Sequence, residues 1–211
     1  MPAMLNIAPG IVLWREKFTR VQQEELLHEI LSLAGDTPFY RPVMPGSGKA
    51  FSVEETNFGP LGWVSDKSGY RYQQTHPVTG KPWPPIPETL LALWDEITGA
   101  LYPHSGPAQC CLVNLYREGA RMGLHQDRDE TALNAPVVSV SLGNDALFRI
   151  GGTARKGATR SLRLLSGDAV MFGGPARLAF HGIDRIYPGS STLVPGGGRI
   201  NLTLRRARGA G

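Results

Sequence analysis

Hydrophobic residues recur at helical spacing in two segments of the first half of the chain. The first segment begins at Thr19, which forms a capping box with Gln22, and its apolar face ends at Gly35. The second segment covers about residues 88–101. A short apolar run at residues 11–14 precedes the first segment and reads as a strand. The pattern therefore predicts two amphipathic helices, the first of them preceded by a strand.

After Pro107 the pattern changes to that of strands. Short apolar or alternating runs are separated by turn residues, a spacing that is typical of all-β sandwiches. The predicted strands cover residues 109–117, 122–127, 136–142, 146–150, 161–165, 169–173, 178–183 and 199–206. We predict a mainly β fold with flanking helices (α+β), in which about eight strands form a double-stranded β-helix, or jelly roll. The two helices should brace one of its sheets.

Residues 37–87 follow neither pattern. They contain short β-like pieces at 50–56 and 70–73, Gly-rich turns and the Pro-rich run HPVTGKPWPPIP. No linker or repeat separates this segment from the rest, so we predict one domain over residues 1–211. The segment should lie over the open end of the jelly roll.

The composition narrows the class of protein. Of the 211 residues, 41% are hydrophobic and 19% are charged, which is typical of a globular chain and not of a disordered one. No apolar run approaches the ~20 residues of a membrane span, and the N-terminus lacks the features of a signal peptide. Cys110 and Cys111 are the only cysteines, which excludes a disulfide framework. We expect a monomeric, cytoplasmic protein without a membrane partner, and its net charge of +4 permits a polyanionic one.

The stretch LHQDRDE, residues 124–130, contains candidate metal ligands. If it continues as a strand, His125, Asp127 and Asp129 point to one side, and same-side neighbours lie ~6.5–7 Å apart. His-x-Asp then suits the two-His-one-carboxylate triad that binds Fe(II). His181, in RLAFHGI, is the one histidine in another apolar strand of the β half. The simpler interpretation is an acidic surface turn and a core histidine.

The last predicted strand, RINLTLR, alternates between apolar and polar positions. Arg199 and Arg205 share its polar side, roughly 20 Å apart at the backbone, and their side chains can converge on a small dicarboxylate. Asn114 and Tyr116, in QCCLVNLYREG, share an inward side of another strand. An arginine on a strand is usually solvated and an inward tyrosine is usually core, but together these residues suit the wall of a pocket.

The ordered motifs resemble those of a known family. LVNLYREG, LHQDRDE, PVVSVSLG, ALFRIGG, LLSGDAVMFGG, AFHGI and RINLTLR, with LGWVSDKSGYRY and KPWPPIP, resemble the AlkB family of Fe(II)- and 2-oxoglutarate-dependent nucleic-acid demethylases. The resemblance extends from about residue 10 to the end. It implies that His125, Asp127 and His181 bind Fe(II). The residues that it implies for 2-oxoglutarate are Asn114, Leu115, Tyr116, Arg199, Asn201 and Arg205.

The resemblance also implies a substrate and a reaction. Residues 37–87 would form a nucleotide-recognition lid. The expected substrate contacts are Trp63, Tyr70, Arg71, Tyr72, Asp129 and Arg155. The implied reaction is oxidative demethylation (dealkylation) of bases such as 1-methyladenine and 3-methylcytosine in single-stranded or locally opened DNA, or in RNA. This direct-reversal repair releases formaldehyde and converts 2-oxoglutarate and O2 to succinate and CO2.

Two other functions remain open from the residues alone. One is a 2-oxoglutarate-dependent hydroxylase that acts on protein or small molecules, and the other is a non-catalytic, cupin-like module that binds metal or nucleic acid. The triad and the arginines do not distinguish among these functions. The aromatic residues of segment 37–87 and the basic charge favour nucleic acid.

Overall fold

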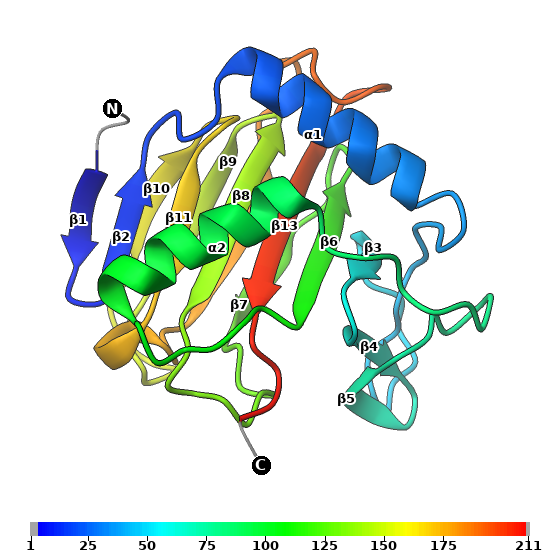
Figure 1. Ribbon diagram of the computed structural model, residues 1–211, viewed down its shortest axis with the longest axis horizontal. Helices are drawn as coiled ribbons and strands as arrows, with labels where there is room; N and C mark the ends of the chain where they lie inside the picture. Colours follow the sequence, from blue (N-terminus) through cyan, green and yellow to red (C-terminus); the bar gives the residue numbers. More distant parts are fainter. Residues whose placement is uncertain (1–3, 210–211) are drawn as a thin grey trace.

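Two antiparallel β-sheets form the body of the protein, of which the computed structural model describes residues 4–209 (Figure 1). The large sheet contains, in spatial order, β1 (Met4–Ala8), β2 (Ile11–Trp14), β11 (Ala169–Phe172), β8 (Val137–Gly143), β13 (Arg199–Arg205), β6 (Cys110–Tyr116) and β3 (Glu54–Phe58). The small sheet contains β10 (Arg160–Leu164), β9 (Ala146–Ile150), β12 (His181–Ile186) and β7 (Met122–His125). A one-turn 3-10 helix, η1 (Gly174–Ala176), follows β11.

The eight strands from β6 to β13 confirm the predicted jelly roll. One hydrophobic layer lies between the two sheets and includes Phe148 and Phe172, whose rings stack 5.9 Å apart. A second layer lies on the other face of the large sheet and includes Leu202. The alternation along β13 separates these layers, because Leu202 faces the helices while Arg199 and Arg205 face the space between the sheets.

Two helices, α1 (Arg20–Leu33) and α2 (Glu88–Leu101), lie across the outer face of the large sheet (Figure 1). The predicted capping box of α1 is present, since Thr19 accepts a bond from the backbone of Gln22 and the Gln22 side chain bonds back. Ile30 of α1 and Trp94 of α2 are fully buried against the sheet. Both predicted helices are confirmed. Neither helix, nor any other helix within residues 4–209, is long and apolar enough to cross a membrane.

Residues 37–87 join the body through β3, which pairs with β6 at the edge of the large sheet. The hairpin of β4 (Gly62–Asp66) and β5 (Gly69–Gln73) projects beside this edge (Figure 1). The strand predicted at 50–56 begins and ends later in the structure, as β3 at Glu54–Phe58. Strands β1 and β4 were not predicted. The reason for the displacement is that β3 has three polar residues at its centre, Glu55, Thr56 and Asn57, all of them fully buried. Hydrophobic patterning does not detect such a strand.

Candidate metal centre and co-substrate pocket

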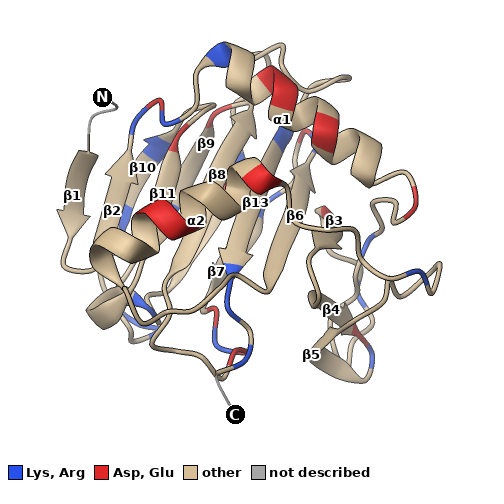
Figure 2. Cartoon of the chain, viewed as in Figure 1, with Lys and Arg blue, Asp and Glu red and all other residues tan. Residues whose placement is uncertain are grey.

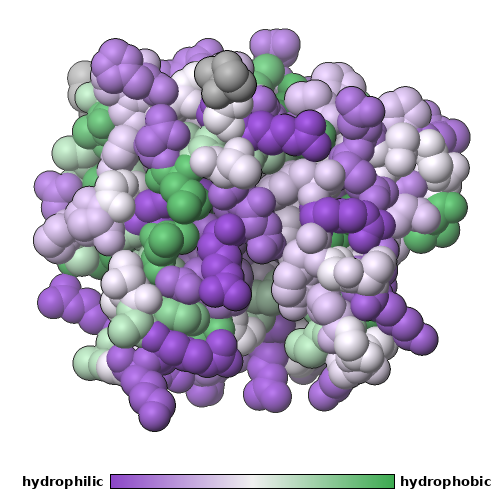
Figure 3. Space-filling view, turned by 90° about the horizontal axis from the view of Figure 1, so that it is seen from below, coloured by the Kyte–Doolittle hydropathy of each residue, from purple (hydrophilic) through white to green (hydrophobic). Residues whose placement is uncertain are grey.

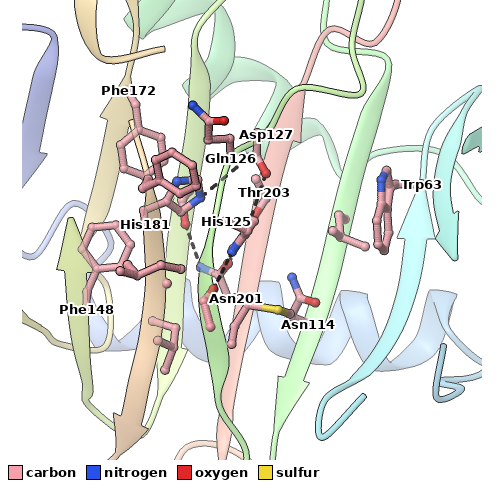
Figure 4. A pocket seen from close by; sticks show the side chains of 18 of the residues that line it. Trp63, Asn114, His125, Gln126, Asp127, Phe148, Phe172, His181, Asn201 and Thr203 are labelled. Atoms are coloured by element: carbon pink, nitrogen blue, oxygen red, sulfur yellow. Dashed lines mark hydrogen bonds and ion pairs between the residues drawn. The ribbon is translucent and has the colours of Figure 1, made fainter. Parts of the chain in front are cut away.

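A cavity of about 490 Å³ opens between the two sheets, and three candidate metal ligands line it. His125 ends β7 and His181 begins β12, where the two strands pair these histidines directly across from each other. Asp127 follows β7 and lies between them, with its carboxylate oxygens 3.7 Å from Nε2 of His125 and 3.9 Å from Nε2 of His181. The potential ligand atoms of the three residues all lie within 4.8 Å of one another (Figure 4). The sequence prediction of this cluster is confirmed as a geometric fact.

The backbone holds both imidazoles in an orientation that suits metal binding. Nδ1 of His125 lies 2.9 Å from the carbonyl of Gly123, and Nδ1 of His181 lies 3.0 Å from the carbonyl of Ala179. A protonated Nδ1 that donates to these carbonyls leaves the lone pair of each Nε2 directed at the cluster. Two imidazole nitrogens and one carboxylate form the donor set of the facial triad for non-haem Fe(II).

The electrostatic environment keeps His181 and Asp127 in their metal-binding protonation states. Burial and the neighbouring His125 lower the pKa of His181 to about 4, so its imidazole is neutral. Burial alone would raise the pKa of Asp127. Arg205, whose Nη2 lies 2.8 Å from the carboxylate, and the two histidines outweigh burial and hold that pKa below its usual range. A neutral imidazole and an ionised carboxylate are the forms that bind metal.

The backbone at the cluster differs from the prediction. Strand β7 ends at His125 and does not continue through Asp127. The side chain of Gln126 donates to the carbonyls of Leu178, at 2.6 Å, and Thr153, at 3.3 Å, and so ties the chain after β7 to two loops. Asp127 therefore reaches the cluster from an irregular segment. The strict strand alternation assumed for this stretch was wrong.

Arg199 presents an unsatisfied positive charge inside the cavity. Its side chain is fully buried, and Nη2 donates to the hydroxyl of Ser141 at 2.7 Å. Nε and Nη1 have no hydrogen-bond partner among residues 4–209, nor does the side-chain oxygen of Asn114. Burial lowers the pKa of Arg199 to about 10, which leaves the guanidinium charged at neutral pH. A buried, incompletely bonded guanidinium suits a carboxylate, with which it can form two parallel hydrogen bonds.

The other predicted co-substrate residues divide between the two faces of the large sheet. Tyr116 stands opposite Arg199 in the sheet, and Asn201 stands opposite Asn114, all on the cavity side. Leu115 is not among the residues that line the cavity. Its side chain lies in the hydrophobic layer under the helices, because side chains of adjacent residues in β6 point to opposite faces.

A buried network of charged residues connects Asp127 with the β4–β5 hairpin. Arg205 contacts the carboxylates of Asp127 and Glu130, and the hydroxyl of Tyr72 donates to Glu130. Arg177 donates to the backbone carbonyl of Asp127 at 2.6 Å and pairs with Glu130 at 3.1 Å. The sequence prediction missed Glu130 and Arg177 as members of the site. The position of Arg177 in the apolar stretch GPARLAF was the available signal.

The predicted substrate residues are only partly brought together. Trp63 lines the cavity, donates from Nε1 to Asp129 at 2.8 Å and stacks on Tyr70 with ring centroids 5.4 Å apart. In Figure 4, Trp63 stands on the hairpin side of the cavity, opposite the metal cluster. Arg155 also lines the cavity, whereas Arg71 pairs with Asp66 on the hairpin and is not among the lining residues. Tyr72 belongs to the buried network described above.

The comparisons with known proteins agree with the fold and the metal cluster. The sequence model of the 2OG-Fe(II) oxygenase superfamily matches residues 10–205, and this superfamily is the class that the jelly roll and the His-Asp-His cluster define. The chain is 56% identical to the alpha-ketoglutarate-dependent dioxygenase AlkB homolog of Caulobacter vibrioides, over 98% of this chain and 91% of the relative. It is 42% identical to the alpha-ketoglutarate-dependent dioxygenase AlkB of Escherichia coli, over 95% and 92% respectively. The solved structure of OsALKBH1 matches with a TM-score of 0.81 at 30% identity, over 97% of this chain and all of that one.

The chain therefore belongs to the AlkB family of Fe(II)- and 2-oxoglutarate-dependent dioxygenases. It is an enzyme of this class, and its reaction requires Fe(II), 2-oxoglutarate and O2. The neutral His181, the ionised Asp127 and the unsatisfied Arg199 fit these requirements.

Proposed function

We propose that this dioxygenase oxidatively demethylates N-alkylated bases, such as 1-methyladenine and 3-methylcytosine, in single-stranded or locally opened DNA and in RNA. The observation that carries the proposal is that one cavity contains both the metal cluster and the stacked aromatic pair of Trp63 and Tyr70. A flat aromatic surface opposite an oxidising centre suits a planar base whose alkyl group is the site of reaction. Residues 37–87 then act as a nucleotide-recognition lid of a single domain.

The protein holds the metal and the co-substrate with residues on both sheets. In this proposal His125, Asp127 and His181 bind Fe(II), and Arg199 binds the distal carboxylate of 2-oxoglutarate with help from Asn114, Tyr116 and Asn201. Arg205, beside Asp127, lies near the end of the co-substrate that faces the metal. When bound, Fe(II) and 2-oxoglutarate use O2 to hydroxylate the alkyl group, with release of succinate and CO2, and the hydroxylated group leaves as formaldehyde.

The residues around the base supply binding and orientation. Because the alkyl group lies on the Watson–Crick edge, the base must leave the duplex stack or come from a single strand. Stacking on an aromatic side chain such as Trp63 is worth ~1–3 kcal/mol per base, and a cationic base adds attraction to the indole face. Asp129 accepts the indole N–H through one oxygen and keeps the other for the exocyclic amine of the base. The reaction needs no proton transfer from Asp129, so its role is to position the substrate.

The distribution of charge supports a polyanionic substrate that binds to the part of the protein remote from the two helices. Helices α1 and α2 together carry six acidic residues and one basic residue (Figure 2). The remainder of the chain therefore has 21 basic and 12 acidic residues, a net charge of +9 against +4 for the whole. Figure 3 views the molecule from below, the end where the β4–β5 hairpin lies in Figure 1, and this face is mainly hydrophilic. The excess of basic residues outside the helices favours a polyanionic substrate.

The test is a coupled assay on short single-stranded oligonucleotides, each containing one 1-methyladenine or 3-methylcytosine, as DNA and as RNA. With Fe(II), 2-oxoglutarate and O2, we expect equal amounts of succinate, formaldehyde and repaired base. Unmethylated oligonucleotides of the same sequence serve as the control. Succinate formation that is equally fast with and without the methyl group, and without repaired base, would refute the proposed substrate and favour a hydroxylase of another class.

A further inference from the structure

Glu55 is a buried carboxyl group with no hydrogen-bond partner among residues 4–209. The residue is fully buried at the centre of β3, and both carboxyl oxygens are inaccessible and unbonded. It lines the same cavity as the metal cluster. Glu130, a buried glutamate of the same cavity, is by contrast engaged by Arg177 and Tyr72. An unpartnered buried carboxyl destabilises the fold, so its presence in a binding cavity points to a ligand.

The strand register fixes the direction in which Glu55 points. Glu55 pairs directly with Asn114 of β6 on one side and with Tyr40 on the other. Asn114 lines the cavity, and directly opposed residues of neighbouring strands project from the same face of a sheet. The side-chain oxygens of Asn114 and Tyr40 also have no partner among residues 4–209. Glu55 and Asn114 are therefore two neighbouring unsatisfied polar groups on the cavity wall, and Tyr40 pairs with Glu55 on its other side.

Within residues 4–209, no charged group forms a hydrogen bond or ion pair with Glu55. Burial raises the pKa of the Glu55 carboxyl to about 8, and the attraction of Arg205 offsets only part of this rise. Arg205 is held by Asp127 and Glu130 and makes no hydrogen bond to Glu55. The carboxyl thus gains most from a ligand that brings a positive charge or a hydrogen-bond donor.

Only one of the two organic ligands of this cavity meets that requirement. 2-Oxoglutarate carries two negative charges, which offer Glu55 neither a positive charge nor a donor and which Arg199 is placed to receive. 1-Methyladenine and 3-methylcytosine carry a positive charge and an exocyclic amine. Neutral methylated bases that bear a carbonyl group in place of the amine have neither the positive charge nor the exocyclic amine. The chemistry of Glu55 therefore matches an alkylated base that is cationic and bears an amine.

We propose that Glu55 is a specificity-determining residue that accepts a hydrogen bond from the exocyclic amine of a cationic alkylated base and so disfavours neutral, carbonyl-bearing bases. This inference rests on the proposed function. Asp129 contacts the base from the side of Trp63, whereas Glu55 meets it from the wall formed by β3 and β6. The carboxylates of Asp129 and Glu55, on different elements, then together select the base.

The experiment compares 3-methylcytosine with 3-methyluracil in otherwise identical oligonucleotides, because these bases differ in the amine or carbonyl at one ring position. The variants are Glu55→Gln, which keeps an acceptor and removes the charge, and Glu55→Leu, which removes both. The control is Glu54→Gln, since Glu54 is adjacent but pairs with Arg41 at the surface. We expect the ratio of kcat/KM for 3-methylcytosine over 3-methyluracil to fall at least ~10-fold in Glu55→Leu and by less in Glu55→Gln. The control should retain the wild-type ratio.

Two further measurements separate a specificity role from a structural one. The KM for 2-oxoglutarate should be the same in all variants, and the ligand-free Glu55→Leu protein should have a higher Tm than wild type because an unsatisfied buried group is removed. An unchanged base ratio in Glu55→Leu, or a lowered Tm in both Glu55 variants, would overturn the inference. Wild-type protein that demethylates neither base would instead refute the proposed function, and the inference would fail with it.

Discussion

Two of the three metal ligands, His125 and His181, occupy paired positions on neighbouring strands. The third, Asp127, comes from the irregular segment after β7. This arrangement leaves no spare donor, because no other cluster of three His, Cys, Asp or Glu ligand atoms occurs within residues 4–209. We expect His125→Ala, Asp127→Ala and His181→Ala each to weaken Fe(II) binding by more than ~100-fold and to abolish turnover, since loss of an outer partner alone costs 10–100-fold. Equilibrium dialysis with Fe(II) under anaerobic conditions measures the affinity.

The control for this prediction is His28→Ala, which removes an exposed histidine of α1 and should leave metal binding unchanged. Full activity in any one of the three ligand variants would remove that residue from the metal site.

Arg199 permits a prediction that concerns the co-substrate alone. Its Nε and Nη1 have no hydrogen-bond partner within the described residues 4–209, which suits the binding of a carboxylate. Lysine keeps the charge but lacks the planar, two-pronged donor group. We expect Arg199→Lys to raise the KM for 2-oxoglutarate by ~10–100-fold, the equivalent of one lost charged hydrogen bond, with Fe(II) affinity unchanged. If succinate assays show an unchanged KM, the distal carboxylate binds elsewhere, with Arg205 as the first alternative.

At the scale of the elements, the loop between β9 and β10 lies at the edge of the cavity. Arg155 lines the cavity, Lys156 is exposed and Arg160 begins β10. If these residues contact phosphates, the triple alanine variant should bind oligonucleotides more weakly, independently of sequence. The slope of log affinity against log salt should become shallower by about 0.7 per lost contact for single strands. Binding over a salt series with iron-loaded protein under anaerobic conditions measures this slope.

A suitable control is Arg20→Ala, because Arg20 lies on α1 and pairs with Glu24 away from the cavity. Equal slopes for wild type and the triple variant would show that the loop does not contact the nucleic acid.

The elements and site residues that were predicted correctly are those with local signals in the sequence. Helix α1 was predicted because its cap and apolar face are local signals, and β13 because all seven of its residues alternate between the two faces. The cluster of His125, Asp127 and His181 was found because His-x-Asp is local and His181 lies in an apolar strand. The side chain of Leu115 follows the same alternation along β6 and lies on the helix side of the sheet.

Glu55 could not be found from the sequence. EETNF reads as a polar surface segment, and its burial follows only from its pairing with β6, about 60 residues later in the chain. Glu130 and Arg177 are joined in the same way, by a contact between segments 47 residues apart. Such non-local contacts are not encoded in hydrophobic periodicity.

At the scale of the whole molecule, Glu55 makes the stability of the fold depend on pH. The carboxyl ionises near 4.5 in the unfolded chain and near 8 in the folded one, so between these values only the folded state keeps the proton. The free energy of unfolding contributed by this group is therefore full below pH 4.5 and is lost as pH rises through 8. We expect the gain in Tm of Glu55→Gln over wild type to be small at pH 5 and largest at pH 9, measured by calorimetry without ligands.

Glu54→Gln is again the matched control, and its Tm difference from wild type should not grow over the same range. A gain for Glu55→Gln that is constant with pH would mean that Glu55 ionises equally in the folded and unfolded states.

The length of β13 between its two arginines has a consequence for how the gene can vary. Arg199 and Arg205 both face the cavity because they are six positions apart along the strand, an even spacing. A single-codon insertion or deletion between them would turn one guanidinium into the apolar layer beneath the helices. The Gly-rich loop before β13, residues 187–198, has no such requirement for parity. Changes in chain length among related proteins should therefore accumulate in this loop and be absent from the interior of β13.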